Sequence, residues 1–423
     1  MEKMKILFIN QTFYPDPVAT AQQLTDLSSY LAKEEHEVWV LTSQRGYTAP
    51  HPCYSAREEY KGVKIVRVWP FALGRKYKLF RVVDSICINL AFLVRLLTLP
   101  RFDSVVALTS PPLVGFIAQW VCRFKKSRLV SWVMDMNPDE AIAMGWIKEN
   151  SLVANLLKWG QRVVVRRSER VIVLDRYMQE RLMLLDSRFR GNDKGAIGFR
   201  REVQGDKMIV IPPWSHDEDL QAVPHEQNPF RKKHLLGKKF VVMYSGNHSV
   251  CHPLDTVLET ARLFKDEPQI VFMFIGGGAR VKDVADFKLK HDLKNIIQRD
   301  YVERSEIKYS LSAADLHLVV MGDNMIGIVH PCKVYGILAL GRPFVYIGPE
   351  QSHIADLMME GAVGYSVRHG DVEKMVEVIR RAQEFSQKEL EAISQKNRGL
   401  AQRFSAGELI PKMAEIILKK KAS

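Results

Sequence analysis

Short runs of apolar residues alternate with helical hydrophobic patterns along almost the whole chain, and this alternation restricts the fold more than any other feature. The first run, Lys5 to Asn10, is followed by a proline-containing loop and then by a helical pattern with Leu24, Leu27 and Leu31 on one face. Buried parallel strands covered by helices produce such a pattern. The sequence therefore predicts an α/β protein.

The length of the chain and the spacing of its strands indicate two domains. A chain of 423 residues exceeds the usual size of a single hydrophobic core. We expect two doubly wound, Rossmann-like domains, residues 1–206 and 207–400, followed by a C-terminal helix at 401–423 that packs back on the first domain. The expected later strands are His36 to Thr42, Lys64 to Trp69, Ser104 to Leu108, Arg128 to Met134, Arg170 to Leu174, Phe240 to Tyr244, Ile270 to Ile275, Leu316 to Met321 and Pro343 to Ile347.

Residues 186–205 fit neither pattern. The segment has four glycines and five basic residues without a hydrophobic period, and we interpret it as an exposed inserted loop. It resembles the peptide produced when a bacterial palindromic repeat is translated within a reading frame. A phosphate-binding basic loop is the alternative interpretation.

The net charge of +13 is concentrated in the first half of the chain. Residues 1–207 carry 32 basic and 21 acidic residues, whereas the remainder carries 29 and 27. This excess predicts an acidic partner for the first domain. We expect no nucleic-acid partner, because the sequence has no helix-turn-helix, zinc-finger or RNP-type motif.

The sequence predicts a cytoplasmic chain that associates peripherally with the inner membrane. Its five scattered cysteines indicate neither a disulfide framework nor a zinc site, and its first residues lack the pattern of a signal peptide. The apolar stretch Ile86 to Leu99 is too short and too polar to cross a bilayer. A basic cluster precedes it: Arg75, Lys76, Lys78 and Arg81. Basic residues beside an apolar helix favour an anionic membrane interface; the alternative is that the helix only covers the sheet.

Each expected domain contains a strand, loop and helix start typical of a phosphate site. In the first domain, the loop after the first strand leads to a helix that begins around Ala19, Thr20 and Ala21. In the second, glycine-containing runs that begin at Gly246 and Gly276 follow two strands. Glycine lets an anion approach the backbone, and a helix start presents unpaired N–H groups. The alternative is that these glycines only turn the chain tightly.

The strongest local signal is HPCKVYGILALGRP at residues 330–343. Pro331 and Cys332 are predicted to open a helix that Gly341 ends, with Lys333 in the first turn. A lysine at this position opposes the helix dipole, which is consistent with an anion bound at the helix start.

Together, motifs from both domains carry a resemblance to a known family. These motifs are KILFINQTFYPDPVATAQQ, ALTSPPLVG, SWVMDMNPDE, VIPPWSHDEDL, YSGNHSVCHPLDT, IGGGA and HPCKVYGILALGRPFVYIGPE. With them, the chain resembles the retaining nucleotide-sugar glycosyltransferases of family 4, which have the GT-B fold. It is most similar to the bacterial amino-sugar (fucosamine-type) transferases of surface-polysaccharide assembly. The inserted loop and residues 47–59 look unrelated to that family.

The resemblance implies how the two domains divide the reaction. In the GT-B fold they face each other across a cleft, with the acceptor on the N-terminal domain. The nucleotide diphosphate of a UDP- or GDP-linked sugar would be held by Gly246, Asn247, Gly277 and the helix of Lys333, without a metal or a cofactor. Lys333 would stabilise the leaving diphosphate. The implied acceptor is a lipid-linked saccharide of O-antigen, capsule or exopolysaccharide biosynthesis.

Three more side chains are candidates within this interpretation. Asp135 follows a strand and suits a group that orients the acceptor hydroxyl or stabilises a cationic transition state; the alternative is an N-cap of the next helix. His248 and His252 are candidate phosphate partners or helix-start residues. Asp217 and Asp219 have the D-x-D spacing of metal-dependent transferases, but they follow a Pro-Pro-Trp crossover, so we expect no metal there.

The chain also departs from the family at two places. Ile328 and Gly336 occupy the positions of a glutamate pair found in many members, and Asn247 and His252 stand where many members carry Arg and Lys. Glu350 is a candidate substitute for the missing carboxylate. Because both glutamate positions are lost and an insertion is present, a catalytically degenerate relative is one alternative. A GT-B sugar-nucleotide epimerase, which needs no acceptor or membrane, is another; the basic first half and the apolar helix argue against it.

Overall fold

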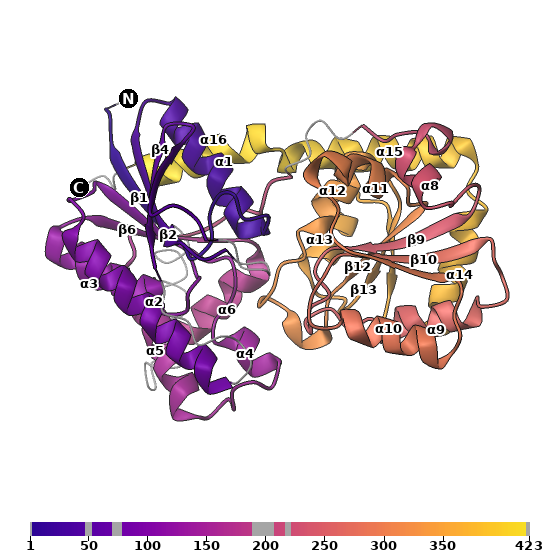
Figure 1. Cartoon of the computed structure of the whole chain (residues 1–423), viewed down its shortest axis with the longest axis horizontal. Helices are drawn as coiled ribbons and strands as arrows, with labels where there is room; N and C mark the ends of the chain where they lie inside the picture. The colour runs from indigo at the N-terminus through magenta and orange to yellow at the C-terminus, as the bar shows by residue number, and fades with distance from the viewer. Residues whose placement is uncertain (1, 47–52, 70–77, 188–206, 216–220, 420–423) are drawn as a thin grey trace. The chain divides into compact units, whose positions relative to one another are not determined.

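The computed structural model describes residues 2–46, 53–69, 78–187, 207–215 and 221–419. The chain divides into two compact units, drawn in Figure 1. The first unit comprises Met1–Pro213, Gly327–His330 and Gly407–Ser423, and the second comprises Trp214–Ile326 and Pro331–Ala406. Each unit is a parallel sheet covered by helices, which confirms the expected α/β architecture.

An eight-stranded sheet in the order β3-β4-β2-β1-β5-β6-β7-β8 forms the centre of the first unit. Its strands are β1 (Lys5–Ile9), β2 (Glu37–Ser43), β3 (Arg57–Tyr60), β4 (Val63–Val68), β5 (Ser104–Ala107), β6 (Arg128–Trp132), β7 (Arg170–Val173) and β8 (Met208–Val210). All neighbours pair in parallel except β3 with β4. The sequence missed β3 because this short edge strand is polar and largely exposed.

The boundary between the units differs from the expected one. Because β8 pairs with β7, its residues complete the first sheet, and the first unit runs to Pro213 rather than to residue 206. Residues 407–423 group with the first unit, where the guanidinium of Arg128 donates hydrogen bonds to the carbonyls of Ile417 and Lys419.

The helices of the first unit cover both faces of its sheet. They are α1 (Ala19–Lys33), α2 (Lys78–Thr98), α3 (Val114–Lys125), α4 (Asp139–Ala143), α5 (Leu152–Arg167), α6 (Arg176–Ser187) and α16 (Ala406–Leu418). As expected, α1 buries Leu24, Leu27 and Leu31. Figure 1 shows α2, α3 and α5 on the side of the sheet away from α1. Within the described residues, no helix is long and apolar enough to span a membrane.

The second unit is built on a six-stranded parallel sheet in the order β11-β10-β9-β12-β13-β14. Its strands are β9 (Phe240–Ser245), β10 (Ile270–Ile275), β11 (Ile296–Arg299), β12 (Leu316–Val320), β13 (Phe344–Ile347) and β14 (Gly364–Val367). Its helices are α8 (Pro229–Lys233), α9 (Asp255–Leu263), α10 (Val281–Lys290), α11 (Ile307–Ser312), α12 (Lys333–Leu340), α13 (His353–Met359), α14 (Val372–Gln383) and α15 (Gln387–Ala401). The sequence missed β11 and β14, which are the partly exposed edge strands.

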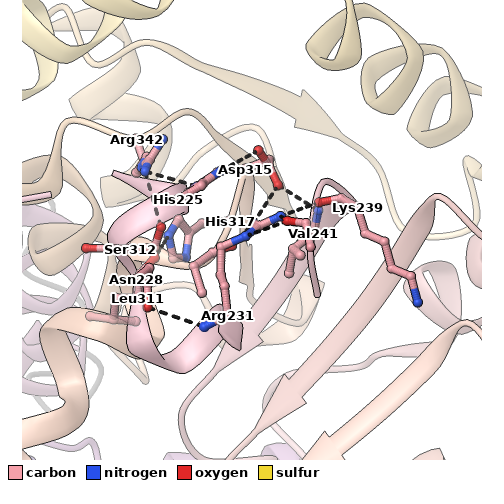
Figure 2. Close-up of polar contacts among 12 residues, drawn as sticks. His225, Asn228, Arg231, Lys239, Val241, Leu311, Ser312, Asp315, His317 and Arg342 are labelled. Carbon is pink, nitrogen blue, oxygen red and sulfur yellow. Dashed lines mark hydrogen bonds and ion pairs between the residues drawn. The ribbon is translucent and has the colours of Figure 1, made fainter. Parts of the chain in front are cut away.

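A buried polar network holds the amino ends of the second sheet together (Figure 2). Arg231, on α8, is buried and donates to the carboxylate of Asp315, just before β12. Asp315 also accepts from the N–H of Val241 at 2.8 Å, and Arg342 donates to His225 at 3.2 Å. A buried guanidinium is stable only with such partners. Ligands of parallel sheets bind at the carboxyl ends of the strands, so this network is structural.

Several sequence predictions lie outside the described residues. These are residues 188–205 of the expected inserted loop, the D-x-D segment within 216–220, and Arg75 and Lys76 of the basic cluster. Lys78 and Arg81 begin α2, but the description does not extend to their side chains.

Candidate functional site

Two loops at the carboxyl edge of the second sheet are joined to each other by their backbones. Ser245 and Ile275 are register partners at the ends of β9 and β10, so the following loops emerge side by side. The N–H of Gly246 donates to the carbonyl of Ile275 at 2.9 Å, and the N–H of His248 donates to the carbonyl of Gly277 at 2.7 Å. The two glycine-containing runs therefore form one paired structure rather than two separate turns.

The glycines of these loops have different roles. Gly276 has a φ of +127°, and a Cβ placed there would lie 2.1 Å from the carbonyl oxygen of Gly246. Gly278 has a φ of +132° and is similarly crowded by His248, so tight packing accounts for both glycines. Gly246 has a φ of +129°, and its Cβ would instead approach the Nζ of Lys333 to 3.4 Å. Gly246 therefore keeps free the space beside a cationic side chain.

The Nζ of Lys333, at the start of α12, is buried and has no hydrogen-bond partner among the described residues. The helix follows Cys332 and ends at Gly341, which has a φ of +69°, as the sequence predicts. The Nζ of Lys333 makes no hydrogen bond within the described residues, and it lies 3.6 Å from the centre of the Tyr244 ring. Burial lowers the pKa of Lys333 to about 7. The cation–π contact with the Tyr244 ring offsets only part of the cost of burying the ammonium. An anion beside Nζ would offset more of this cost and would restore the charged form.

Two histidines border this lysine in their neutral form. Burial, and then the charge of Lys333, lower the pKa of His252 to about 3, and the same two causes lower the pKa of His248. The Nδ1 of His252 is buried without a hydrogen bond to the described residues. The next helix, α9, begins at Asp255 after the N-cap Leu254, so the helix-start alternative for His252 is wrong. Both rings therefore border the lysine as neutral polar groups.

The other candidates of the second unit lie farther from Lys333 or act through the backbone. The carbonyl of Asn247 accepts a hydrogen bond of 2.8 Å from the hydroxyl of Tyr244, which fixes the ring below Lys333. Glu350 is exposed and follows β13, which is separated from β9 by β12. Within the described residues, no hydrogen bond or ion pair joins Glu350 to Lys333. The carboxylate role of Glu350 stays a prediction.

Asp135 lies at the carboxyl edge of the first sheet, beyond β6. Its N–H donates to the Oγ1 of Thr109, which follows the neighbouring strand β5, at 3.2 Å. Burial raises the pKa of the Asp135 carboxyl to about 6. The helix α4 begins at Asp139 with Pro138 as its N-cap, so Asp135 is not the cap that the alternative interpretation proposed.

The first turn of α1 is reached from the same edge. Ala19, Thr20 and Ala21 follow the N-cap Val18, which has no side chain able to cap the helix. The hydroxyl of Thr20 is hydrogen-bonded to that of Thr12, just after β1, at 3.3 Å. The neighbouring strands β1, β5 and β6 are parallel, so their carboxyl ends lie at one edge of the first sheet. This helix start and Asp135 therefore share that edge.

Sequence reasoning missed Arg67, which braces the loop before α1. This buried side chain on β4 donates to the carbonyl of Tyr14 at 2.8 Å and to the carboxylate of Glu58 at 2.7 Å. Its guanidinium also stacks on Tyr54, whose hydroxyl donates to Asp16 at 3.3 Å. The segment around β3, whose sequence looks unrelated to the family 4 glycosyltransferases, therefore supports the loop before α1. An arginine within a strand gives no sequence signal for this role.

The sequence of this chain is similar to a glycosyltransferase domain family and to two glycosyltransferases. Residues 19–189 match the glycosyl transferase 4-like domain. The chain is 24% identical over 274 residues to the probable glycosyltransferase WbjE of Pseudomonas aeruginosa, which covers 64% of each chain. It is 21% identical over 401 residues to the putative colanic acid biosynthesis glycosyl transferase WcaI of Escherichia coli, or 90% of this chain and 92% of that one. The alignment thus spans just under two thirds of WbjE.

A solved structure shares the fold of the whole chain. HepE of Anabaena, in complex with UDP-glucose, superposes with a TM-score of 0.67 over 98% of this chain and 99% of its own, at 16% sequence identity. This likeness shows the fold, which is the two-domain GT-B fold that the sequence resemblance implied.

The site residues form two groups, one in each unit. In the second unit the structure brings Lys333, Gly246, His248 and His252 together around a desolvated cation, which is the chemistry of an anion site. In the first unit it places Asp135 on the same sheet edge as Ala19, Thr20 and Ala21. The site assignments themselves stay predictions.

Proposed function

We propose that this protein is a glycosyltransferase of bacterial cell-surface polysaccharide biosynthesis. It transfers a sugar, of the amino-sugar type, from a UDP- or GDP-linked donor to a lipid-linked saccharide, and it retains the anomeric configuration. The observation that carries the proposal is the buried ammonium of Lys333, which has no hydrogen-bond partner within the described residues and lies beside Gly246. The family match, the names of WbjE and WcaI, and the UDP-glucose complex of HepE support the same reaction.

The donor diphosphate would bind at Lys333. Breaking the bond between the sugar and the diphosphate leaves negative charge on the leaving group, and a cation in a desolvated site stabilises that charge more strongly than one in water. Losing one such group typically raises the barrier by about 3 kcal/mol. Lys333 and the start of α12 would supply this stabilisation, so we propose transfer without a metal or a cofactor.

Asp135 would act on the acceptor side. With a pKa of about 6, its carboxyl is largely ionised at neutral pH. A carboxylate can orient the acceptor hydroxyl or stabilise positive charge on the sugar ring. A lipid-linked acceptor places the reaction at the cytoplasmic surface of the inner membrane, where the basic first half of the chain would meet anionic lipid.

Release of UDP or GDP from a panel of nucleotide sugars, with and without lipid extract, tests this function. We expect release that depends on the extract and that falls by about two orders of magnitude in Lys333→Ala. The matched control is Lys290→Ala, an exposed lysine at the end of α10, which should behave as wild type. Release that ignores the extract would favour the epimerase alternative. Turnover that survives in Lys333→Ala would overturn the site assignment.

A further inference from the structure

One helix of the first unit is apolar on two opposite faces. The inner face of α2 buries Ile88, Phe92 and Leu96 in the core of the first unit. Its outer face carries four side chains that are 53% to 63% exposed, Ile86, Leu90, Val94 and Leu97. Their spacing of three and four residues places them on one stripe. The two sequence interpretations of this segment, a sheet-covering helix and a membrane-contacting helix, thus describe opposite faces of the same helix.

Two further helices extend this exposed apolar stripe. Trp120 and Phe124 on α3 are 59% and 82% exposed, and Leu152 and Leu156 on α5 are 88% and 58% exposed. We call these side chains, together with Trp159 and the α2 stripe, the three-helix apolar surface. Soluble proteins rarely expose so many large apolar side chains on adjacent elements unless the surface binds a partner.

The three helices are direct neighbours. Phe116, on α3, makes ring contacts with Trp120 on its own helix and with Trp159 on α5, with 5.2 Å between the Phe116 and Trp159 ring centres. The Nζ of Lys125, at the end of α3, donates to the carbonyls of Leu96 and Leu97 at the end of α2. The helices therefore lie side by side on one face of the first unit (Figure 1), and each of them has exposed apolar side chains.

Positive charge gathers at the C-terminal ends of the same helices. Exposed basic side chains follow α2, end α3 and end α5: Arg101, Arg123, Lys126, Arg166 and Arg167. Acidic groups near these ends are already engaged, since Glu169, just after α5, pairs with Arg128 at 3.0 Å and Asp103 accepts from the N–H of Lys5 at 2.8 Å. The partner of this surface should therefore be apolar inside and anionic outside.

We propose that the three-helix apolar surface docks on an anionic lipid bilayer. Tryptophan and phenylalanine side chains insert at the level of the headgroups, and the basic helix ends contact lipid phosphates. A second copy of the chain fits less well, because the same basic ends would face one another. The sequence pointed to the basic cluster at residues 75–81 and to α2, and the structure adds the aromatic anchors of α3 and α5. The purpose of docking, which is access to a lipid-linked acceptor, rests on the proposed function. Binding to vesicles, however, can be measured without a sugar donor.

Co-sedimentation with vesicles tests the surface. The probes are phosphatidylcholine vesicles with and without phosphatidylglycerol. Two paired variants remove anchors, Trp120→Ser with Phe124→Ser on α3, and Leu152→Ser with Leu156→Ser on α5. The matched control is Leu235→Ser with Leu289→Ser, side chains of the second unit that are 84% and 78% exposed. Since all of these side chains are exposed, thermal unfolding should not distinguish the variants from wild type.

We expect wild type to prefer the anionic vesicles, and each anchor pair to weaken binding about tenfold or more. The control pair should bind as wild type does. Binding that survives in both anchor pairs overturns the proposal. The proposal is also overturned if sedimentation velocity shows a wild-type dimer that dissociates in both anchor-pair variants while their vesicle binding is unchanged. Should wild type bind the vesicles but release nucleotide from no donor, the proposed function fails while the docking surface is supported.

Discussion

The buried ammonium of Lys333, which makes no hydrogen bond to the described residues, predicts that nucleotide binding depends on pH in an unusual range. In the free protein the pKa of this lysine is lowered from 10.5 to about 7 by burial. A bound diphosphate places negative charge beside Nζ and favours the protonated form. The pKa must therefore rise on binding, and the protein takes up a proton when the pH lies between the free value of about 7 and the higher value of the bound state. Binding is strongest at low pH and weakens as the pH rises through the free value.

The size of the effect follows from the shift. Above the free pKa, the fraction of protein with a charged lysine falls tenfold for each pH unit, so the apparent affinity for UDP or GDP should be about tenfold lower at pH 8 than near pH 6.5 and about a hundredfold lower at pH 9. The two neighbouring histidines do not produce this change, because burial and the charge of Lys333 lower the pKa of both His248 and His252.

Isothermal titration calorimetry with UDP and GDP, in buffers of different ionisation enthalpy, measures both affinity and proton uptake. Wild type should take up close to one proton at pH 8. Lys333→Arg is the matched control, because a guanidinium stays charged and should remove the uptake while keeping binding. Lys333→Met should bind weakly at every pH. Equal wild-type affinity at pH 6.5 and pH 9 would refute the assignment of the anion site to Lys333.

Three other predictions concern single positions. Gly276→Ala should destabilise the second unit by about 2 kcal/mol or more, because its Cβ meets the Gly246 carbonyl; Gly361→Ala, with a φ of +120° but open space, isolates the backbone strain, and thermal unfolding compares the two. Asp135→Asn should lower kcat about a hundredfold and remove the fall in wild-type rate below about pH 6, where that carboxyl becomes protonated; a retained acid limb would contradict this role. Arg67→Ala should raise KM for the acceptor and leave KM for the donor unchanged, with Arg67→Lys in between; an equal change in both would show a merely structural role.

The parts of the fold that local sequence determines were predictable. The helix α12 was expected because Pro331 and Gly341 mark its ends within a few residues of sequence. The edge strands β3, β11 and β14 were missed because exposed strands carry no apolar run. Their existence depends on pairing with a neighbouring strand, which a single-sequence pattern does not record.

Features of the site that arise from distant residues could not be predicted. The sequence marked Lys333, but its burial and its contact with Tyr244 require α12 to pack beside the end of β9, which is far away in the chain. The role of Arg67 likewise depends on Tyr14 and Glu58, which come from two other segments. For α2, an apolar pattern on both faces could not say which face the sheet covers.

The two halves of the chain use charge in different ways: the second half through one buried cation and the first half through many exposed basic side chains. The half beyond residue 207 carries nearly balanced charge, yet it holds the cation proposed to bind the donor. A single ammonium removed from water and aimed at a defined point interacts strongly with a phosphate, so no general basic field is needed there. The first half carries most of the excess, and its exposed basic side chains at the ends of α3 and α5 act at long range and are screened by salt. Raising the ionic strength should therefore weaken vesicle binding far more than it weakens nucleotide binding, because only the vesicle contact relies on exposed charge.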